Sequence, residues 1–302
     1  MNEQFATVGD LSLCYETFGD ESDPALLLIM GLATQMVGWN EDFCRQLADR
    51  GFRVIRFDNR DVGRSSRIDS VPPPKPLELL TRRIKRVPYT LEDMADDAAG
   101  LLSALGIERA HVVGASMGGM IAQSLAARHP GRVLSLVSIM STTGNRFKGQ
   151  PAFRVYPTFL ARPPRTKEES IERIARLFKI IGSPAFDHDE LELRAMANLS
   201  WDRGHSPAGP GRQLAAIIAS GDRTTDVRRI AAPTLVIHGT KDRLVRPSGG
   251  RATARAIPGS RLLMIDGMGH DLPRGAWSRI LDAIAENAAR AGDASGQPAA
   301  AA

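Results

Sequence analysis

The sequence HVVGASMGGMIAQ, residues 111–123, is the segment from which the fold prediction starts. A short apolar run ends at Gly114, Ser116 follows, and Gly118 and Gly119 open a helical pattern. The serine therefore stands where a strand must turn sharply into a helix. Asn or Asp would tolerate such a turn better than Ser. Glycines on both sides indicate that the hydroxyl group itself must be presented, with nothing bulky beside it.

Short apolar runs alternate with amphipathic helical patterns on both sides of this segment, which predicts an α/β fold. We expect a mostly parallel central sheet flanked by helices, with residues 11–19 as a half-exposed strand near the sheet edge. Further strands are expected at 25–30, 53–58, 110–115, 133–141, 233–239 and 261–266, and helices at 40–51, 91–106, 117–129 and 276–291. Thr90 with Asp93 three residues later resembles a capping box for one of these helices.

The interval 144–209 contains proline-rich turns and helical patterns but no strand pattern. The simplest interpretation is a helical cap inserted between two strands of the sheet. We therefore predict a core formed by residues 1–143 and 210–292, a cap at 144–209, and a disordered tail at 293–302.

The composition is that of an ordinary globular protein, with 43% hydrophobic and 24% charged residues in a chain of 302. No apolar run approaches the roughly 20 residues of a membrane span, and no secretory signal is evident. The net charge is +5, but its one basic cluster, residues 81–86, is short. Cys14 and Cys44 form neither a disulfide framework nor a metal-ligand spacing. We expect a cytoplasmic protein without membrane or nucleic-acid partners.

Chemically useful residues follow several of the expected strands. Ser116, Asp242 and His270 each follow one, and Gly31 with Leu32 follows another. Because ligands bind at the carboxyl ends of strands in open α/β sheets, we expect these residues to meet at one rim.

Each of these residue types suits nucleophilic catalysis. A serine hydroxyl needs a base to remove its proton during attack, and His270 would supply it. The base needs a carboxylate to fix its tautomer; Asp242 is favoured, with Asp266 and Asp271 as rivals. The backbone N–H groups of Leu32 and Met117 would stabilise the oxyanion. The expected site residues are therefore Ser116, Asp242, His270, Leu32 and Met117.

The sequence also resembles a known family. GASMG, residues 114–118, matches the G-x-S-x-G nucleophile elbow, and the order Ser, Asp, His is that of the α/β-hydrolase superfamily. Together with LLLIMGLATQMVGWNEDF, RFDNRDVGRSS, PTLVIHGTKD and IDGMGHDLP, the chain from about 11 to 290 resembles the capped serine esterases related to aclacinomycin methylesterase. Met30 and Ala115 stand where many relatives have histidine, which alters the pocket wall.

The resemblance implies a serine hydrolase that cleaves small-molecule carboxylic esters through an acyl-enzyme, without metal or other cofactor. Lactonases, carbon–carbon bond hydrolases and perhydrolases share this constellation, and a non-catalytic hydrolase-fold receptor is a further alternative. Whether the protein forms a homodimer is left open.

We expect Asp58, Arg60 and Asp61 to brace the loop near the site. The cap residues Phe153, Tyr156, Phe159, Ile174 and Phe178 are expected to form the cap core, with substrate contact as the alternative.

Overall fold

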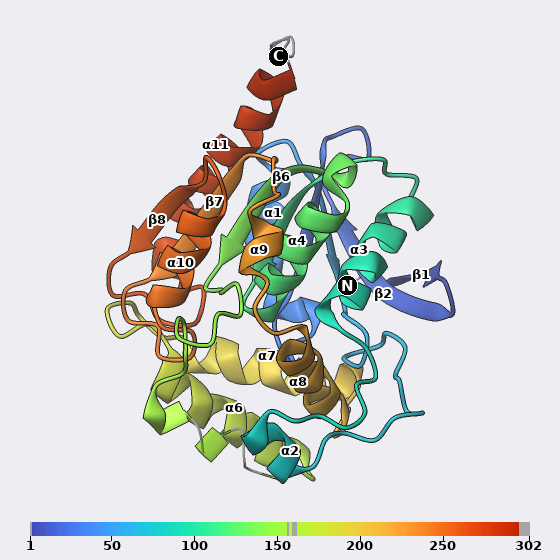
Figure 1. Cartoon of the computed structure of the whole chain (residues 1–302), viewed down its shortest axis with the longest axis vertical. Helices are drawn as coiled ribbons and strands as arrows, with labels where there is room; N and C mark the ends of the chain where they lie inside the picture. The colour runs from blue at the N-terminus through green and yellow to red at the C-terminus, as the bar shows by residue number, and fades with distance from the viewer. Residues whose placement is uncertain (1, 156, 159–161, 296–302) are drawn as a thin grey trace.

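Eight strands form one sheet in the order β1-β2-β4-β3-β5-β6-β7-β8 (Figure 1). The structure, a computed structural model, describes residues 2–155, 157–158 and 162–295. β2 pairs antiparallel with β1 and with β4, and all other neighbours are parallel, which confirms the mostly parallel sheet. The strands are β1 (Gln4–Val8), β2 (Leu11–Phe18), β3 (Ala25–Ile29), β4 (Arg53–Phe57), β5 (Ala110–Ala115), β6 (Val133–Ile139), β7 (Thr234–Gly239) and β8 (Arg261–Ile265).

The antiparallel end of the sheet differs from the prediction. The edge strand is β1, and most of β2 is buried rather than alternately exposed. Glu16 on β2 is buried because its carboxylate pairs at 2.5 Å with Arg56 on the neighbouring β4. A buried ion pair of this kind places polar residues at inward positions, so the alternation of residue types was a poor guide to exposure here.

Helices cover both faces of the sheet. α1 (Glu41–Ala48) and α11 (Trp277–Ser295) cover one face, around a core that includes Trp39 and Phe43. The other face carries α3 (Leu91–Ala104), α4 (Met117–Arg128), α9 (Thr224–Val227) and α10 (Ser248–Ala256). The expected capping box is present, since Thr90 and Asp93 exchange hydrogen bonds at the start of α3. α11 continues through Ser295, and residues 296–302 of the expected tail lie outside the described part of the chain.

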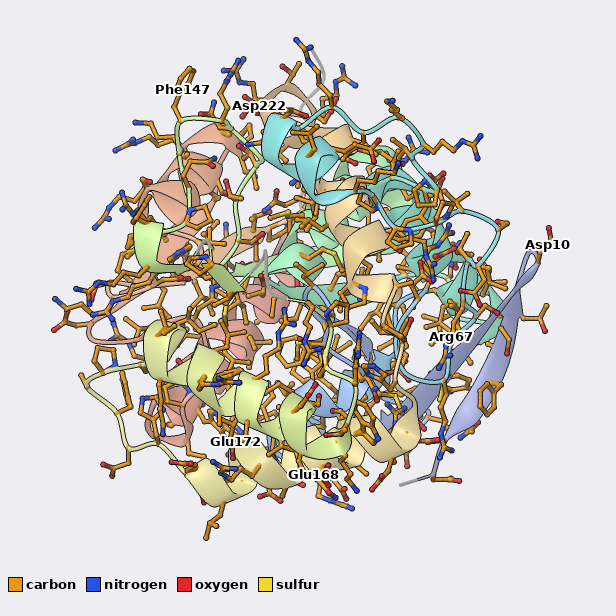
Figure 2. The ribbon with its side chains drawn as sticks, turned by 90° about the horizontal axis from the view of Figure 1, so that it is seen from below. Asp10, Arg67, Phe147, Glu168, Glu172 and Asp222 are labelled. Carbon is orange, nitrogen blue, oxygen red and sulfur yellow. The ribbon has the colours of Figure 1, made fainter. Side chains whose placement is uncertain are left out.

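The cap lies between β6 and β7. The described residues from 140 to 233 contain no strand, and they include α6 (Lys167–Ile181), α7 (Glu190–Arg203) and α8 (Gly209–Ser220), together with the short turn Phe153–Val155. Figure 1 shows these helices with α2 (Pro76–Thr81) below the sheet, and Figure 2 views them from that side, with Glu168 and Glu172 on α6. The helical cap is therefore confirmed, while its boundaries at 144 and 209 stay a prediction.

A buried ion pair joins the cap to the core. Arg203, the last residue of α7, donates to Asp58 at 2.8 Å and to Glu3 at 2.6 Å. Asp58 also accepts from the Met36 N–H at 2.7 Å, so one carboxylate ties a cap helix to the loop after β3. In the same loop as Asp58, Asp61 pairs with Arg212 at the start of α8; these contacts give Asp58 and Asp61 the bracing role expected of them.

Arg60 has a similar part, since it pairs with Asp97 of α3 at 2.6 Å. Within the residues described, no helix combines the length and apolar content needed to cross a bilayer.

Candidate active site

Ser116 occupies a strained turn between β5 and α4. Its backbone has φ 56° and ψ −119°, a conformation that costs a non-glycine residue about 1–3 kcal/mol. The Ser116 N–H donates to the Ile139 carbonyl at 2.9 Å, and the Ser141 hydroxyl donates to the Ser116 carbonyl at 2.8 Å. The end of β6 therefore holds the turn from one side.

The glycines around Ser116 have a packing function. A Cβ atom added to Gly114 would lie 2.1 Å from the Gly118 carbonyl oxygen, and one added to Gly118 would lie 2.0 Å from the Ile29 carbonyl oxygen. One on Gly119 would lie 2.6 Å from the Ser141 Cβ. Only glycine lets β5, α4 and the end of β3 approach this closely, and the turn stands out from the sheet as a result.

The structure brings Ser116, His270 and Asp242 together. The His270 Nε2 atom lies 2.9 Å from the Ser116 Oγ, and its Nδ1 atom lies 2.7 Å from the Asp242 Oδ2. Asp242 is 3% exposed and His270 is 8% exposed, so the hydrogen bond between these two side chains is shielded from water. Such an arrangement can pass the hydroxyl proton to the imidazole while the carboxylate stabilises the imidazolium.

The surroundings of Asp242 keep its carboxylate ionised. Burial alone would raise its pKa, but the charge of His270 and hydrogen bonds from His238 and His270 outweigh burial and lower the pKa to about 2. The backbone N–H groups of Leu244 and Val245 both donate to Oδ1 at 2.9 Å. One oxygen is thus held by the backbone, and the other faces the imidazole.

The rival carboxylates are engaged elsewhere. Asp266 is exposed and accepts from the Thr240 hydroxyl at 2.8 Å. Asp271 accepts a short hydrogen bond from the buried Ser183 hydroxyl, and burial raises its pKa. Neither contacts the ring nitrogens of His270 in the described residues, so the contacts favour Asp242.

The expected oxyanion donors lie next to the serine. Met117 is the first residue of α4, where N–H groups lack helical partners and the helix dipole is positive. A Cβ atom added to Gly31 would lie 3.6 Å from the Ser116 Oγ, so the loop carrying Leu32 runs beside the hydroxyl. Across the part of the chain that the structure describes, neither the Leu32 nor the Met117 N–H has an acceptor. Both remain available to a ligand oxygen.

The sequence prediction missed a contact between the cap and the loop of His270. The His270 N–H donates to the carbonyl of Ile181 at the end of α6 at 2.7 Å, and the Gly269 N–H donates to the Ser183 hydroxyl at 2.8 Å. No local sequence pattern marked Ser183, because its partner Gly269 lies 86 residues away in the chain.

A second missed residue lies behind the carboxylate. The His238 Nε2 atom is 2.8 Å from the Val245 carbonyl and 3.4 Å from the Asp242 Oδ2, and the side chain is completely buried. Its position in an apolar strand pattern gave no sign of this contact. His238 therefore supports the loop that carries Asp242.

The other histidines have structural partners. His111 lies 2.9 Å from the Ser135 hydroxyl, and burial lowers its pKa to about 4. His129 lies 2.6 Å from Asp96, and His205 stacks on Trp201. In the described ranges, no group of three or more His, Cys, Asp or Glu side chains could hold a metal ion.

The expectation for the cap aromatics was wrong for Phe153, which is 86% exposed and so does not belong to a cap core. Ile174 and Phe178 on α6 are half-buried. Tyr156 and Phe159 lie outside the described residues.

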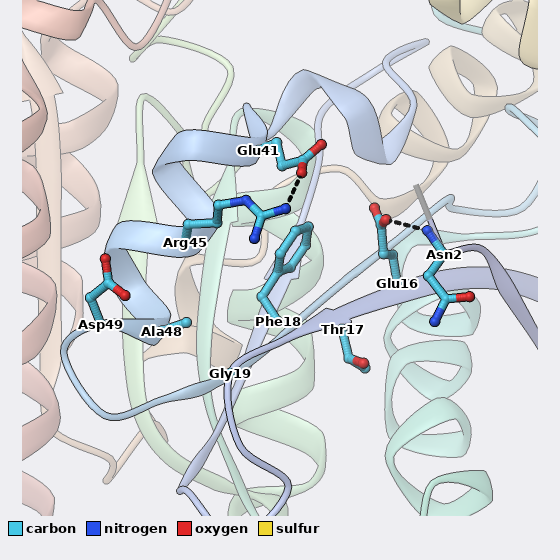
Figure 3. Close-up of a pocket in the computed structure, with 9 residues that line it drawn as sticks. All are labelled: Asn2, Glu16, Thr17, Phe18, Gly19, Glu41, Arg45, Ala48 and Asp49. Atoms are coloured by element: carbon cyan, nitrogen blue, oxygen red, sulfur yellow. Dashed lines mark hydrogen bonds and ion pairs between the residues drawn. The ribbon is translucent and has the colours of Figure 1, made fainter.

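A surface pocket of about 660 Å³ lies away from this site, between β2 and α1 (Figure 3). Its walls include Glu16, Phe18 and the exposed pair formed by Glu41 and Arg45. It contains none of the residues of the Ser116 site, and three of its charged side chains, Glu16, Glu41 and Arg45, already have partners within the protein.

Comparisons with known proteins agree with the fold. A family model described as the alpha/beta hydrolase fold matches residues 24–273. Rhodomycin D methylesterase DauP of Streptomyces sp. (strain C5) is 30% identical, over 94% of this chain and 97% of that protein. The 3-oxoadipate enol-lactonase 2 of Acinetobacter baylyi is 27% identical, over 86% of this chain and 87% of its own. The solved structure of an esterase from Rhodococcus sp. ECU1013 superposes with a TM-score of 0.73 at 21% identity, covering 96% of this chain and 99% of that one.

Proposed function

Because this chain belongs to the α/β-hydrolase family, we propose that it is a serine hydrolase that cleaves carboxylic esters through an acyl-enzyme intermediate. The observation that carries the proposal is the continuous path of hydrogen bonds from the Ser116 hydroxyl through His270 to Asp242, with lengths of 2.9 Å and 2.7 Å. We propose Ser116 as the nucleophile, His270 as the base and Asp242 as the acid, and these contacts support the three roles.

In the acylation step, the Ser116 Oγ attacks the ester carbonyl carbon while its proton moves to the Nε2 atom of His270. The carbonyl oxygen becomes an oxyanion and accepts from the free N–H groups of Leu32 and Met117. The tetrahedral intermediate then collapses. The alcohol leaves with the proton from His270, and the acyl group stays on the serine.

Deacylation repeats these steps with water. His270 takes a proton from the water molecule as its oxygen attacks the acyl carbon, and it returns that proton to the Ser116 oxygen as the acid departs. Asp242 stays ionised throughout, because its pKa of about 2 lies far below neutral pH. The proposal therefore requires no redox or metal chemistry.

Two relatives suggest which esters to test first. The rhodomycin D methylesterases are named for the hydrolysis of a methyl ester, and the enol-lactonase is named for a lactone, which is a cyclic ester. Both bonds are broken by the same acyl transfer. We therefore propose methyl esters as the first substrate class and lactones as the second candidate, since the latter differ only in keeping the leaving alcohol attached.

The test is turnover of short aryl esters, methyl esters and lactones by the wild-type protein and by Ser116→Ala. We expect ester turnover and labelling by a fluorophosphonate in the wild type, and neither in Ser116→Ala, with circular dichroism unchanged. Labelling that persists in the variant would contradict the choice of nucleophile. A wild type that binds esters without turning them over would favour the receptor alternative.

A further inference from the structure

The loop between β3 and Gln35 holds its peptide groups in fixed orientations, beginning with the peptide that joins Met30 to Gly31. The Met30 carbonyl accepts from the side-chain amide of the buried Asn59 at 2.9 Å. In the next peptide, the Gly31 carbonyl accepts from the Thr34 N–H at 3.2 Å. That second peptide also carries the Leu32 N–H, which is left without an acceptor in the described chain.

The third peptide is fixed by a residue far away in the sequence. The Ala33 N–H donates at 2.8 Å to the side-chain oxygen of Gln213 on α8, 180 residues later. The Nε2 atom of Gln213 donates to the Arg60 carbonyl at 2.9 Å. Because a backbone N–H can only donate and a carbonyl can only accept, these two contacts determine the orientation of the amide.

The conformation of Ala33 explains why this loop needs such support. Its φ of 59° lies in the left-handed region, which is unfavourable for a residue with a Cβ atom. The Gln213 side chain is completely buried, so the Ala33 N–H is held from the interior of the protein. Release of that contact removes the partner that offsets the strain, and the peptide can then turn.

From these contacts we infer that Gln213 is a positioning residue for the oxyanion hole, holding the loop so that the Leu32 N–H points toward the oxygen bound at Ser116. The inference rests on the proposed function. It assigns a part in catalysis to α8, the helix that leads the chain from the cap back to the sheet. Asn59 holds the opposite end of the same loop.

Gln213→Leu tests the inference, because it removes both hydrogen bonds. The apolar Leu side chain fills much of the space that Gln213 occupies. We expect kcat/KM for a short aryl ester to fall between about tenfold and a hundredfold, with KM nearly unchanged, as loss of one oxyanion donor affects the transition state. Phenylboronic acid is the second probe, since its boron forms a tetrahedral adduct with the serine oxygen. Its inhibition constant should rise by a similar factor.

Asn287→Leu is the matched control. Asn287 lies on α11, away from the loop of Leu32, and its side chain is also a buried amide. It donates to the Leu136 and Pro233 carbonyls at 3.1 Å. Both variants should lower the melting temperature. Only Gln213→Leu should weaken inhibition by phenylboronic acid.

Gln213→Glu provides a second variant with a pH readout. A protonated Glu side chain can still accept from Ala33 and donate to Arg60, whereas an ionised one loses the donor and places a charge in a buried site. The ratio of its kcat/KM to that of wild type should therefore fall as the pH rises through the pKa of the introduced carboxyl group. A purely structural role would lower stability without this matched loss of turnover and boronate affinity.

An unchanged boronate affinity in Gln213→Leu, or a ratio for Gln213→Glu that does not depend on pH, would overturn the inference. Failure of the proposed function has a different outcome. In that case the wild type would not turn over esters, or Ser116→Ala would retain the activity.

Discussion

The Asp242 carboxylate has a separate task for each of its oxygens, and this division leads to the first prediction. Oδ1 is held by two backbone N–H groups, so Oδ2 faces Nδ1 of His270. Asp242→Asn keeps the shape of the side chain but replaces one oxygen by an NH₂ group, which is a donor. When that group faces His270, the imidazole is left in the wrong tautomer. We expect kcat on an aryl ester to fall by about 10⁴ with the fold retained.

Asp266→Asn is the control for that measurement, since Asp266 is exposed and bonded to Thr240. It should leave kcat within about twofold of the wild-type value, because a surface substitution of this kind has little effect. The opposite ranking of the two variants would mean that Asp266 is the acid.

The lowered pKa of Asp242 also predicts how stability depends on pH. Its value of about 2 lies below the ordinary 3.8, so the folded state binds this proton less readily than the unfolded chain does. The contribution to the free energy of unfolding is then fully present above about pH 4 and is lost as the pH falls to about 2; it amounts to roughly 2 kcal/mol.

Urea unfolding of wild type and Asp242→Asn across this pH range checks the prediction. The difference between their free energies of unfolding should stay constant above pH 4 and shrink below it. A difference that does not change between pH 4 and 2 would contradict the lowered pKa.

The sequence alone indicated some of the residues at the candidate site and gave no sign of others. Ser116, Asp242 and His270 could be found because each follows a strand, and strand ends are visible as the ends of apolar runs. Gln213 and Ser183 could not, since nothing in a single sequence distinguishes a buried polar side chain with a distant partner from an exposed one. The contact between Gln213 and Ala33, across 180 residues, exists only after folding.

Among the elements, the crossing of β5, α4 and β3 is where the chain tolerates the least change. A Cβ atom at Gly118 would lie 2.0 Å from a backbone oxygen of β3, which cannot move without displacing the strand. We expect Gly118→Ala to lower the free energy of unfolding by about 3 kcal/mol or more and to reduce turnover, as other overpacking changes in cores do. Thermal unfolding and aryl-ester turnover measure the two effects.

Gly131→Ala is the matched control, because no atom lies within 4 Å of the position of its added Cβ. It should change the free energy of unfolding by less than about 0.5 kcal/mol. Equal effects of the two substitutions would show that the close approach of the strands and helix is not what requires glycine at 118.

Two of the elements that the sequence did not predict, β1 and α10, have different causes. β1 is a five-residue edge strand in a hairpin, too short and too exposed for its residues to form a clear apolar pattern. α10 contains Gly249 and Gly250, which weaken a helical pattern; a Cβ atom at Gly250 would lie 2.4 Å from the His238 ring. Packing therefore chose residues there that local propensity disfavours.

For the molecule as a whole, the cap is connected to the chemistry and does not merely cover it. The end of α6 accepts from the His270 N–H, and Ser183 bridges Gly269 and Asp271. Ser183→Ala removes that bridge and leaves the buried Asp271 carboxylate short of a donor. We expect labelling by a small fluorophosphonate, which is too short to reach the cap, to slow by about tenfold because His270 is less well held.

Ser170→Ala on the partly exposed face of α6 should label at the wild-type rate, since no hydrogen bond joins Ser170 to the loop of His270 among the described residues. If Ser183→Ala also labels at that rate while its melting temperature falls, the contact stabilises the cap without any effect on the base.

The 154 residues that separate Ser116 from His270 also set an order of events while the chain is being made. Ribosomes add about 5–20 residues per second, so the nucleophile emerges roughly 8 to 30 seconds before its base. During that time β5 and α4 can form, but the serine has no group to take its proton. Under the proposed function, a nascent chain is therefore expected to be inert toward esters, and chains released before residue 270 are expected to stay inert.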